Sequence, residues 1–158
     1  RGLKLMKKKI VVKIQNEDFD VKNELDIIRR NNPKIGAIVT FIGLVRDFNQ
    51  KENISEMDLE HYPGMTEIVL EKIANEANDK WDCENILVIH RIGKLKPMDQ
   101  IVLVIVCSAH RGKAFSACQF VIDFLKTKAP FWKREVTGVG SRWVEARESD
   151  LTSESKWH

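Results

Sequence analysis

Basic side chains stand at points of the sequence where an apolar segment ends. His110 and Arg111 follow the apolar run Ile101–Cys107 and precede a segment with helical spacing, so we expect them at a helix N-terminus. The first N–H groups of a helix have no partner within it and have partial positive charge. A histidine and an arginine there would complete an anion site, with phosphate as a natural ligand. The alternative is that both side chains merely cap and solvate the end of the strand.

Two further cations also allow a functional and a structural interpretation. Arg46 ends the strand-like run Gly36–Val45, where an arginine is commonly just solvated. Lys126 lies near the end of the expected third helix, where a cation also stabilises the helix dipole. Spacing alone does not bring either of them to the pair His110 and Arg111.

The segment after Pro130 places two cations side by side. If it is a strand, Lys133 and Arg134 point to opposite faces, so one of them lies on the less solvated side. A lysine held among cations or apolar groups loses proton affinity, and it can act as a nucleophile or as an acid–base group. Glu135 could position such a lysine or simply balance its charge.

Signatures of other chemistries are missing from the sequence. It has no glycine-rich phosphate loop and no nucleophile elbow. Its histidines do not recur at metal-ligand intervals, which disfavours a metalloenzyme; they are His61, His90, His110 and His158.

Three cysteines, Cys83, Cys107 and Cys118, are widely separated and form no CxxC pair. An odd number at such spacing argues against a disulfide framework or a zinc site, and it favours reduced thiols in the cytoplasm. Cys107 lies in an apolar strand run and Cys118 on an apolar helix face, so both are predicted to pack in the core.

The composition is that of one folded domain. The chain has 158 residues, of which 43% are hydrophobic and 31% charged, enough to bury a core. A net charge of +3 disfavours a nucleic-acid binder, which usually has a dense basic face. No apolar run reaches the roughly 20 residues of a membrane span.

We expect the domain to occupy residues 10–150, with residues 151–158 as a flexible tail. Residues 1–9 are basic but are followed by no signal-like apolar stretch, so they are predicted to be an extension. Met6 is a candidate natural start, which would make residues 1–5 non-native; a longer native N-terminus is the alternative.

Hydrophobic periodicity predicts an alternation of strands and helices. Asp20 is expected to cap the first helix, Pro63 to stand near the start of the second, and Pro130 to end the third. Apolar residues recur at helical spacing in the second helix, at Met65, Ile68, Val69, Ile73, Ala77 and Trp81. The third helix is expected to have an apolar face of Ala114, Phe115, Cys118, Val121, Ile122 and Leu125. A charged loop is expected from Asp47 to Asn53. Strands are expected over Ile10–Ile14, Gly36–Val45, Ser55–Tyr62, Asn85–Ile92, Gln100–Cys107, Phe131–Thr137 and Arg142–Ala146. Consecutive strands with short links favour antiparallel or mixed pairing, and therefore an α+β domain.

Read together, several segments resemble the molybdopterin synthase catalytic (large) subunit family. The resemblance runs from about Ile10 to about Asp150. It is most specific in the following segments, which occur in this order: Leu59–Met65, Ile89–Gly93, Ser108–Arg111, Lys126–Glu135 and Arg142–Ala146.

The resemblance implies an α/β hammerhead with an additional antiparallel β subdomain, and a sulfurtransferase activity in molybdenum cofactor biosynthesis. Members convert cyclic pyranopterin monophosphate (precursor Z) into the dithiolene molybdopterin. The sulfur comes from the C-terminal Gly-Gly thiocarboxylate of a small ubiquitin-like partner. Two large subunits form a homodimer within a heterotetramer. No metal and no cofactor is implied for this chain, nor a nucleic acid or membrane partner.

The resemblance also implies roles for individual residues. Lys126 is expected near the thiocarboxylate. Lys133 is expected to be its partner in acid–base catalysis or in contact with the substrate. His110 and Arg111 resemble the residues that hold the pterin phosphate. The remaining positions are expected to contact substrate, Arg147 from the neighbouring subunit; they are Leu44, Val45, Arg46, Arg134, Glu135 and Arg147.

Two other functions are compatible with the residues. One is a non-catalytic module that binds a Gly-Gly C-terminal tail in the same groove. The other is a generic phosphate-binding α+β domain. A protein with either function would not form the dithiolene product of the sulfurtransferase.

Overall fold

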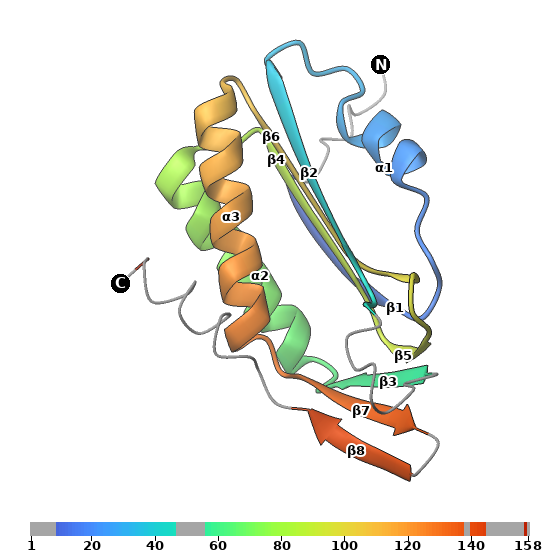
Figure 1. Cartoon of the computed structure of the whole chain (residues 1–158). Helices are drawn as coiled ribbons and strands as arrows, with labels where there is room; N and C mark the ends of the chain where they lie inside the picture. The colour runs from blue at the N-terminus through green and yellow to red at the C-terminus, as the bar shows by residue number, and fades with distance from the viewer. Residues whose placement is uncertain (1–8, 47–55, 138–139, 145–156, 158) are drawn as a thin grey trace, which may run out of the picture.

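The computed structural model describes residues 9–46, 56–137, 140–144 and 157, and for residues 134–137 and 140–144 it describes the backbone alone. Within these residues the chain forms three helices and eight strands, arranged in two four-stranded sheets (Figure 1). The domain boundaries expected at residues 9/10 and 150/151 stay predictions.

The first sheet has the strand order β1-β4-β6-β2. β1 (Ile10–Gln15) pairs in parallel with β4 (Asn85–Arg91), and β4 pairs antiparallel with β6 (Gln100–Ser108). β2 (Ala37–Leu44) is antiparallel to β6, with Ala37 opposite Ser108. Apolar side chains on both faces of β4 and β6 make these strands the buried centre of the sheet.

Helices cover the two faces of this sheet unequally. α2 (Met65–Trp81) and α3 (Arg111–Lys128) pack on one face, around a core that includes Phe120. α1 (Val21–Ile28) lies on the other face, as Figure 1 shows. α1 starts as predicted, because a carboxylate oxygen of Asp20 accepts a hydrogen bond from the backbone N–H of Asn23 at 3.1 Å.

The second sheet is antiparallel throughout and has the order β5-β3-β7-β8. Its strands are β5 (Gly93–Leu95), β3 (Glu56–His61), β7 (Phe131–Thr137) and β8 (Gly140–Val144). α3 leads directly into β7, so the C-terminal end of α3 lies against this sheet (Figure 1).

The α+β prediction is confirmed, and the second sheet is the additional antiparallel subdomain. β5 was not predicted. It has three residues, begins at Gly93 with a φ of +88° and ends before the turn at Pro97 and Met98, and so short a strand shows no periodicity.

Parts of the predicted apolar helix faces are wrong. Met65 and Ile68 on α2 and Phe115 on α3 are exposed, at 51%, 64% and 61%. Helical spacing marks a broad stripe, whereas the neighbours of each helix cover only part of it. On α3 the buried residues instead include Ala117, Phe120 and Phe124.

Trp157 is the only residue beyond position 144 that the structure describes. Its ring contacts those of Trp81 and Phe120 edge-on, at centroid distances of 5.8 and 5.6 Å. Its Nε1 also donates to the buried carboxylate of Asp123. The predicted loop Asp47–Asn53 lies outside the described residues. No helix among those residues is long and apolar enough to cross a membrane.

Candidate active site

The N-terminal end of α3 presents His110 and Arg111, as predicted. His110 is the N-cap residue, with extended backbone (φ −132°, ψ 143°), yet its side chain makes no capping hydrogen bond. Both side chains are exposed, and neither has an ion pair among the described residues. Since the imidazole does not cap the helix, it remains available with the arginine for an anion from outside.

Gly36 fixes the backbone just before this end of α3. Its N–H donates to the carbonyl of Ser108 at 3.0 Å. A Cβ at Gly36 would lie 2.2 Å from the carbonyl oxygen of Ala109, closer than atoms can approach. The start of β2 therefore packs directly on the chain that leads into His110.

The C-terminal end of α3 presents Lys126 and continues into β7. Lys126 is exposed in the last turn, where the helix dipole favours a cation. Lys133 is half-buried on β7, opposite Leu59, which is 1% exposed. Phe131 and Lys133 are two residues apart in a strand, so they share one face of β7.

His90 is the last buried residue of β4. Its ring stacks on that of Phe131, with a centroid distance of 3.8 Å and an interplanar angle of 17°. Its Nδ1 lies 2.8 Å from the carbonyl oxygen of Arg91. The side chain is buried, at 6% exposure.

Burial is the main cause that lowers the pKa of His90, to about 4. The hydrogen bond to the Arg91 carbonyl opposes the shift, while the charges of Lys126, Lys133 and His61 add to it. The charges of both lysines therefore act on the same imidazole. At neutral pH that imidazole is uncharged.

His61 of β3 is a second histidine next to Phe131. The two ring centroids are 6.4 Å apart. His61 Nδ1 is buried without a hydrogen-bond partner, and its nearest carboxylate oxygen, on Glu67, is 3.9 Å away. Neither His61 nor His90 was predicted as a site residue. The available signal for His90 was a histidine that closes an otherwise apolar buried strand.

The end of β2 lies at the same end of the molecule as the lysines. Leu44 is 55% exposed and Arg46 is exposed, whereas Val45 packs with Met57 and Leu95 in a small core. The backbone N–H of Val45 donates to the carbonyl of Asp99, and the carbonyl of Val45 accepts from the N–H of Met98. Leu44 and Arg46 are thus placed where a ligand could reach their side chains, and Val45 holds the strand end in position.

The structure does not bring all predicted residues together in one chain. Arg111 and Lys126 are 15 positions apart on one helix, which separates them by about 22 Å along its axis. Leu44, Arg46, Lys126 and Lys133 belong to one end of α3, and His110 and Arg111 to the other.

The remaining predicted residues are only partly described. Arg134 and Glu135 pair in register with Asp58 and Met57 of β3, which places their backbone beside the lysine end. Their side chains and Arg147 lie outside the described part of the structure.

The cysteine thiols are buried, as predicted for Cys107 and Cys118. Burial raises the pKa of Cys83 to about 11 and that of Cys118 to about 12, so both stay protonated thiols. Among the described residues no three His, Cys, Asp or Glu side chains gather into a group that could hold a metal.

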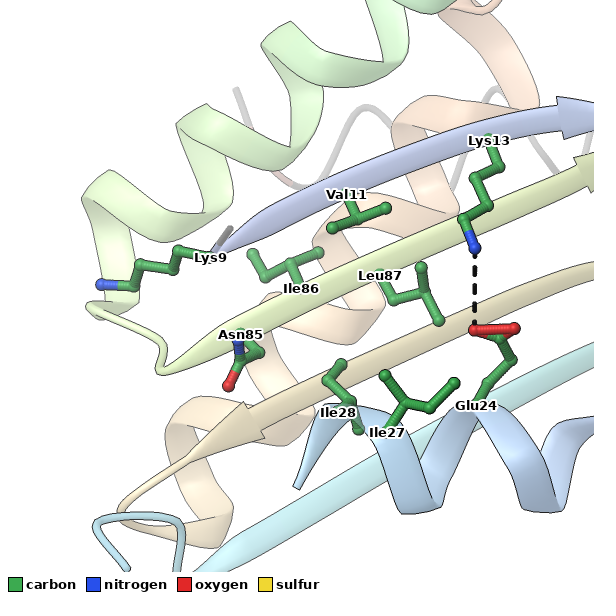
Figure 2. A pocket seen from close by; sticks show the side chains of 9 residues that line it. All are labelled: Lys9, Val11, Lys13, Glu24, Ile27, Ile28, Asn85, Ile86 and Leu87. Carbon is green, nitrogen blue, oxygen red and sulfur yellow. Dashed lines mark ion pairs between the residues drawn. The ribbon is translucent and has the colours of Figure 1, made fainter. Parts of the chain in front are cut away.

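A cavity of about 120 Å³ lies away from all these residues, between α1 and the strands β1 and β4 (Figure 2). Lys9, Ile28 and Asn85 are among its lining residues, and Lys13 and Glu24 form an ion pair of 3.9 Å across its rim.

The comparisons with known proteins agree with one another. A family model described as MoaE protein matches residues 14–128. The molybdopterin synthase catalytic subunit of Ralstonia nicotianae is 53% identical over 146 residues, which are 92% of this chain and 83% of that protein.

Two solved structures give the same result. The molybdopterin biosynthesis MoaE protein from Burkholderia ambifaria MC40-6 has a TM-score of 0.81 at 49% identity, covering 94% of this chain and 97% of that one. Molybdopterin synthase from Staphylococcus aureus has a TM-score of 0.78 at 32% identity, covering 84% and 96%. The similarity extends over both ends of α3.

Proposed function

The chain belongs to the MoaE protein family, and on that premise we propose that it is the catalytic subunit of a molybdopterin synthase. It transfers sulfur from the thiocarboxylated C-terminus of a small partner subunit to cyclic pyranopterin monophosphate, and the product is the molybdopterin dithiolene. The observation that supports this most is 53% identity to a catalytic subunit over 92% of the chain. The free thiols fit a cytoplasmic location.

The buried thiols fit a division of labour between two subunits. A sulfur carrier needs an accessible thiolate, and the cysteines of this chain are buried, two of them with a raised pKa. Sulfur that arrives already activated on a partner removes the need for one. What remains for this chain is to position the reactants, stabilise charge and transfer protons.

We assign proton transfer and contact with the thiocarboxylate to Lys126 and Lys133. They flank the junction of α3 and β7, Lys126 on α3 and Lys133 on β7, and the charges of both act on His90. Two ammonium groups there would stabilise the anionic tail of the partner and the charge that develops when its sulfur leaves. A lysine that has lost its proton could accept one from the substrate.

An exposed apolar surface beside the lysines is where we place the small partner. It consists of Tyr62, Met65 and Ile68, which are 59%, 51% and 64% exposed. The Thr66 hydroxyl bonds to the carbonyl of Pro130 at 3.4 Å, which ties this surface to the junction of α3 and β7. Contiguous exposed apolar side chains commonly mark a protein interface.

His110 and Arg111 are assigned to the substrate phosphate, and the distance along α3 then requires a second copy of the chain. A pterin monophosphate cannot span about 22 Å between Arg111 and Lys126 of one helix. In a homodimer, the N-terminal end of one α3 can meet the lysine end of its partner. The pocket is then completed across the dimer interface.

The test is conversion of precursor Z by the purified chain with its thiocarboxylated small subunit, with the dithiolene product measured. The double variant Lys126→Ala, Lys133→Ala is expected to lose about 10² to 10⁴ in kcat, the range for acid–base groups. Arg111→Ala is expected to raise KM about tenfold, since a hydrogen bond to a charged group contributes about 1.5 kcal/mol.

Lys72, exposed on α2, supplies the matched control Lys72→Ala, which should behave like the unmodified protein. Full activity of the lysine double variant would refute the assigned roles. Tight binding of the partner tail without any product would favour the non-catalytic tail-binding module instead.

A further inference from the structure

His90 differs from the other histidines that the structure describes. It is the only one of the three that is buried, since His61 is half-buried and His110 is exposed. The nitrogens of a buried imidazole require hydrogen-bond partners. The stacking of His90 on Phe131 connects it to the segment between Lys126 and Lys133.

The ring of His90 is fixed by its bond to Arg91. A carbonyl oxygen only accepts hydrogen bonds, so Nδ1 must carry the proton that it donates over 2.8 Å. In the neutral ring Nε2 is then left with a lone pair. Arg91 is itself held, because its side chain donates to the carbonyls of Asn16 and Gln100 at 3.1 and 2.9 Å.

The stacked ring of Phe131 links His90 to the lysines through the backbone. Phe131 is the first residue of β7, five residues after Lys126 and two before Lys133. Its N–H donates to the carbonyl of Ala129 at 2.8 Å, which closes the turn out of α3. Stacking on His90 therefore holds the chain where it passes from α3, which includes Lys126, into β7, which includes Lys133.

The charges around His90 explain why a neutral ring is useful here. Lys126 from α3, Lys133 from β7 and His61 from β3 all act on it. A protonated imidazole would add a further positive charge to a site that already has two ammonium groups. A neutral imidazole instead presents the lone pair of Nε2, and a lone pair attracts an ammonium group.

We propose that His90 is a positioning residue for Lys126 and Lys133. It holds the junction of α3 and β7 by stacking on Phe131, and it offers Nε2 as an acceptor to the lysines. A phenylalanine at this position could stack but would leave the Arg91 carbonyl without its donor and the lysines without an acceptor. The inference rests on the proposed function for the role of the lysines in the reaction, but not for their placement.

The first test measures the lysines in the free protein, without partner or substrate. Reductive methylation is followed per lysine by mass spectrometry from pH 7 to 10, in the unmodified chain and in His90→Phe, His90→Asn and His90→Gln. We expect Lys126 and Lys133 to react about threefold faster in His90→Phe, because they lose a hydrogen-bond acceptor that stabilises the charged ammonium form. The rate at exposed Lys72 should not change.

The amide variants separate the two contacts of the ring. Asparagine can reproduce the donor at Nδ1 but not the acceptor at Nε2, so His90→Asn should behave like His90→Phe. Glutamine can place an acceptor near Nε2, so His90→Gln should restore the lysine rates. Unchanged rates at both lysines in all three folded variants would overturn the proposal. If His90→Phe does not fold, the asparagine and glutamine pair decides.

The second test uses the complete synthase reaction. His90→Phe is expected to lower kcat about tenfold, a fraction of the loss on removing an acid–base group, and to leave KM within twofold. His90→Gln should recover most of kcat. If His90→Phe lowers Tm but does not lower kcat selectively while KM stays unchanged, His90 only stabilises the fold. If the unmodified chain transfers no sulfur, the proposed function fails while the methylation test still decides the role of His90.

Discussion

The two ends of α3 hold positive charge in different surroundings. At the N-terminal end, His110 and Arg111 are exposed and lie beside unpaired helix N–H groups. At the C-terminal end, the charges of Lys126 and Lys133 act on the buried ring of His90 and help to keep its pKa low. The first arrangement suits binding of an anion from solvent, and the second suits groups whose position and proton affinity must be controlled. One helix thus separates binding from chemistry.

The largest expected effect tests whether the two ends cooperate across a dimer. One parent variant is His110→Ala, Arg111→Ala, and the other is Lys126→Ala, Lys133→Ala. In a hybrid dimer, one pocket combines the intact lysines of the first copy with the intact phosphate end of the second. Two differently tagged chains allow the hybrid to be purified and assayed. We expect the hybrid to have about half of the kcat/KM of the unmodified dimer. Each parent is expected to have a kcat/KM reduced by about 10² or more.

The control for this prediction is the mixture of parents before subunit exchange, which should remain inactive. A hybrid no more active than its parents would show that the two ends of one chain do not serve different pockets. The division of the site between two copies would then be abandoned.

The separation of the two ends could have been predicted from the sequence. An apolar pattern that extends from Ala114 to Leu125 already predicts three turns of helix between His110 and Lys126. Recognition of motifs groups residues by function and gives no distance between them. The strand Gln100–Ser108 and the cap Asp20 were predicted because periodicity and capping are local.

His90 and Phe131 show what local patterns omit. They are 41 positions apart, and their stacking depends on how two sheets meet at the end of α3. The same holds for Phe115 and Ile68, whose apolar type predicted burial that no neighbouring element provides. These features come from tertiary packing, which the spacing of residues along the chain does not encode directly.

The next effect compares His90 with His110 through the pH dependence of stability. Above pH 6.5 His90 is neutral in the folded and the unfolded chain. Between pH 6.5 and about 4, the unfolded chain protonates His90 while the folded chain does not. Stability should therefore fall as the pH is lowered through this range, by about 3 kcal/mol in total.

Urea unfolding at several pH values, followed by circular dichroism, measures this loss. In His90→Gln most of the decline between pH 6.5 and 4 should disappear, whereas His110→Gln should keep it because His110 is exposed. An equal decline in both variants would show that His90 is not held neutral by burial, and the contrast between the two ends would lose its electrostatic basis.

The smallest effect compares Gly36, just before β2, with Gly43 near the end of β2, one at each end of α3. A Cβ at Gly36 meets the backbone oxygen of Ala109 at 2.2 Å, and a Cβ at Gly43 meets Cγ1 of Val102 at 2.6 Å. Backbone must shift in the first case, while a side chain can give way in the second. Gly36→Ala should cost about 2 kcal/mol of stability and Gly43→Ala about 1 kcal/mol, within the range for overpacking.

The functional consequences of the two substitutions should differ in kind. Ala109 precedes His110, so Gly36→Ala should displace the phosphate end and raise KM for the pterin substrate. Gly43 precedes a register shift that leads to Leu44 and Arg46, so Gly43→Ala should act at the lysine end and lower kcat. Steady-state kinetics of both variants check this. If each changes KM and kcat in the same proportion, the ends of α3 do not divide binding from chemistry, because a shift at one end would then reach both steps.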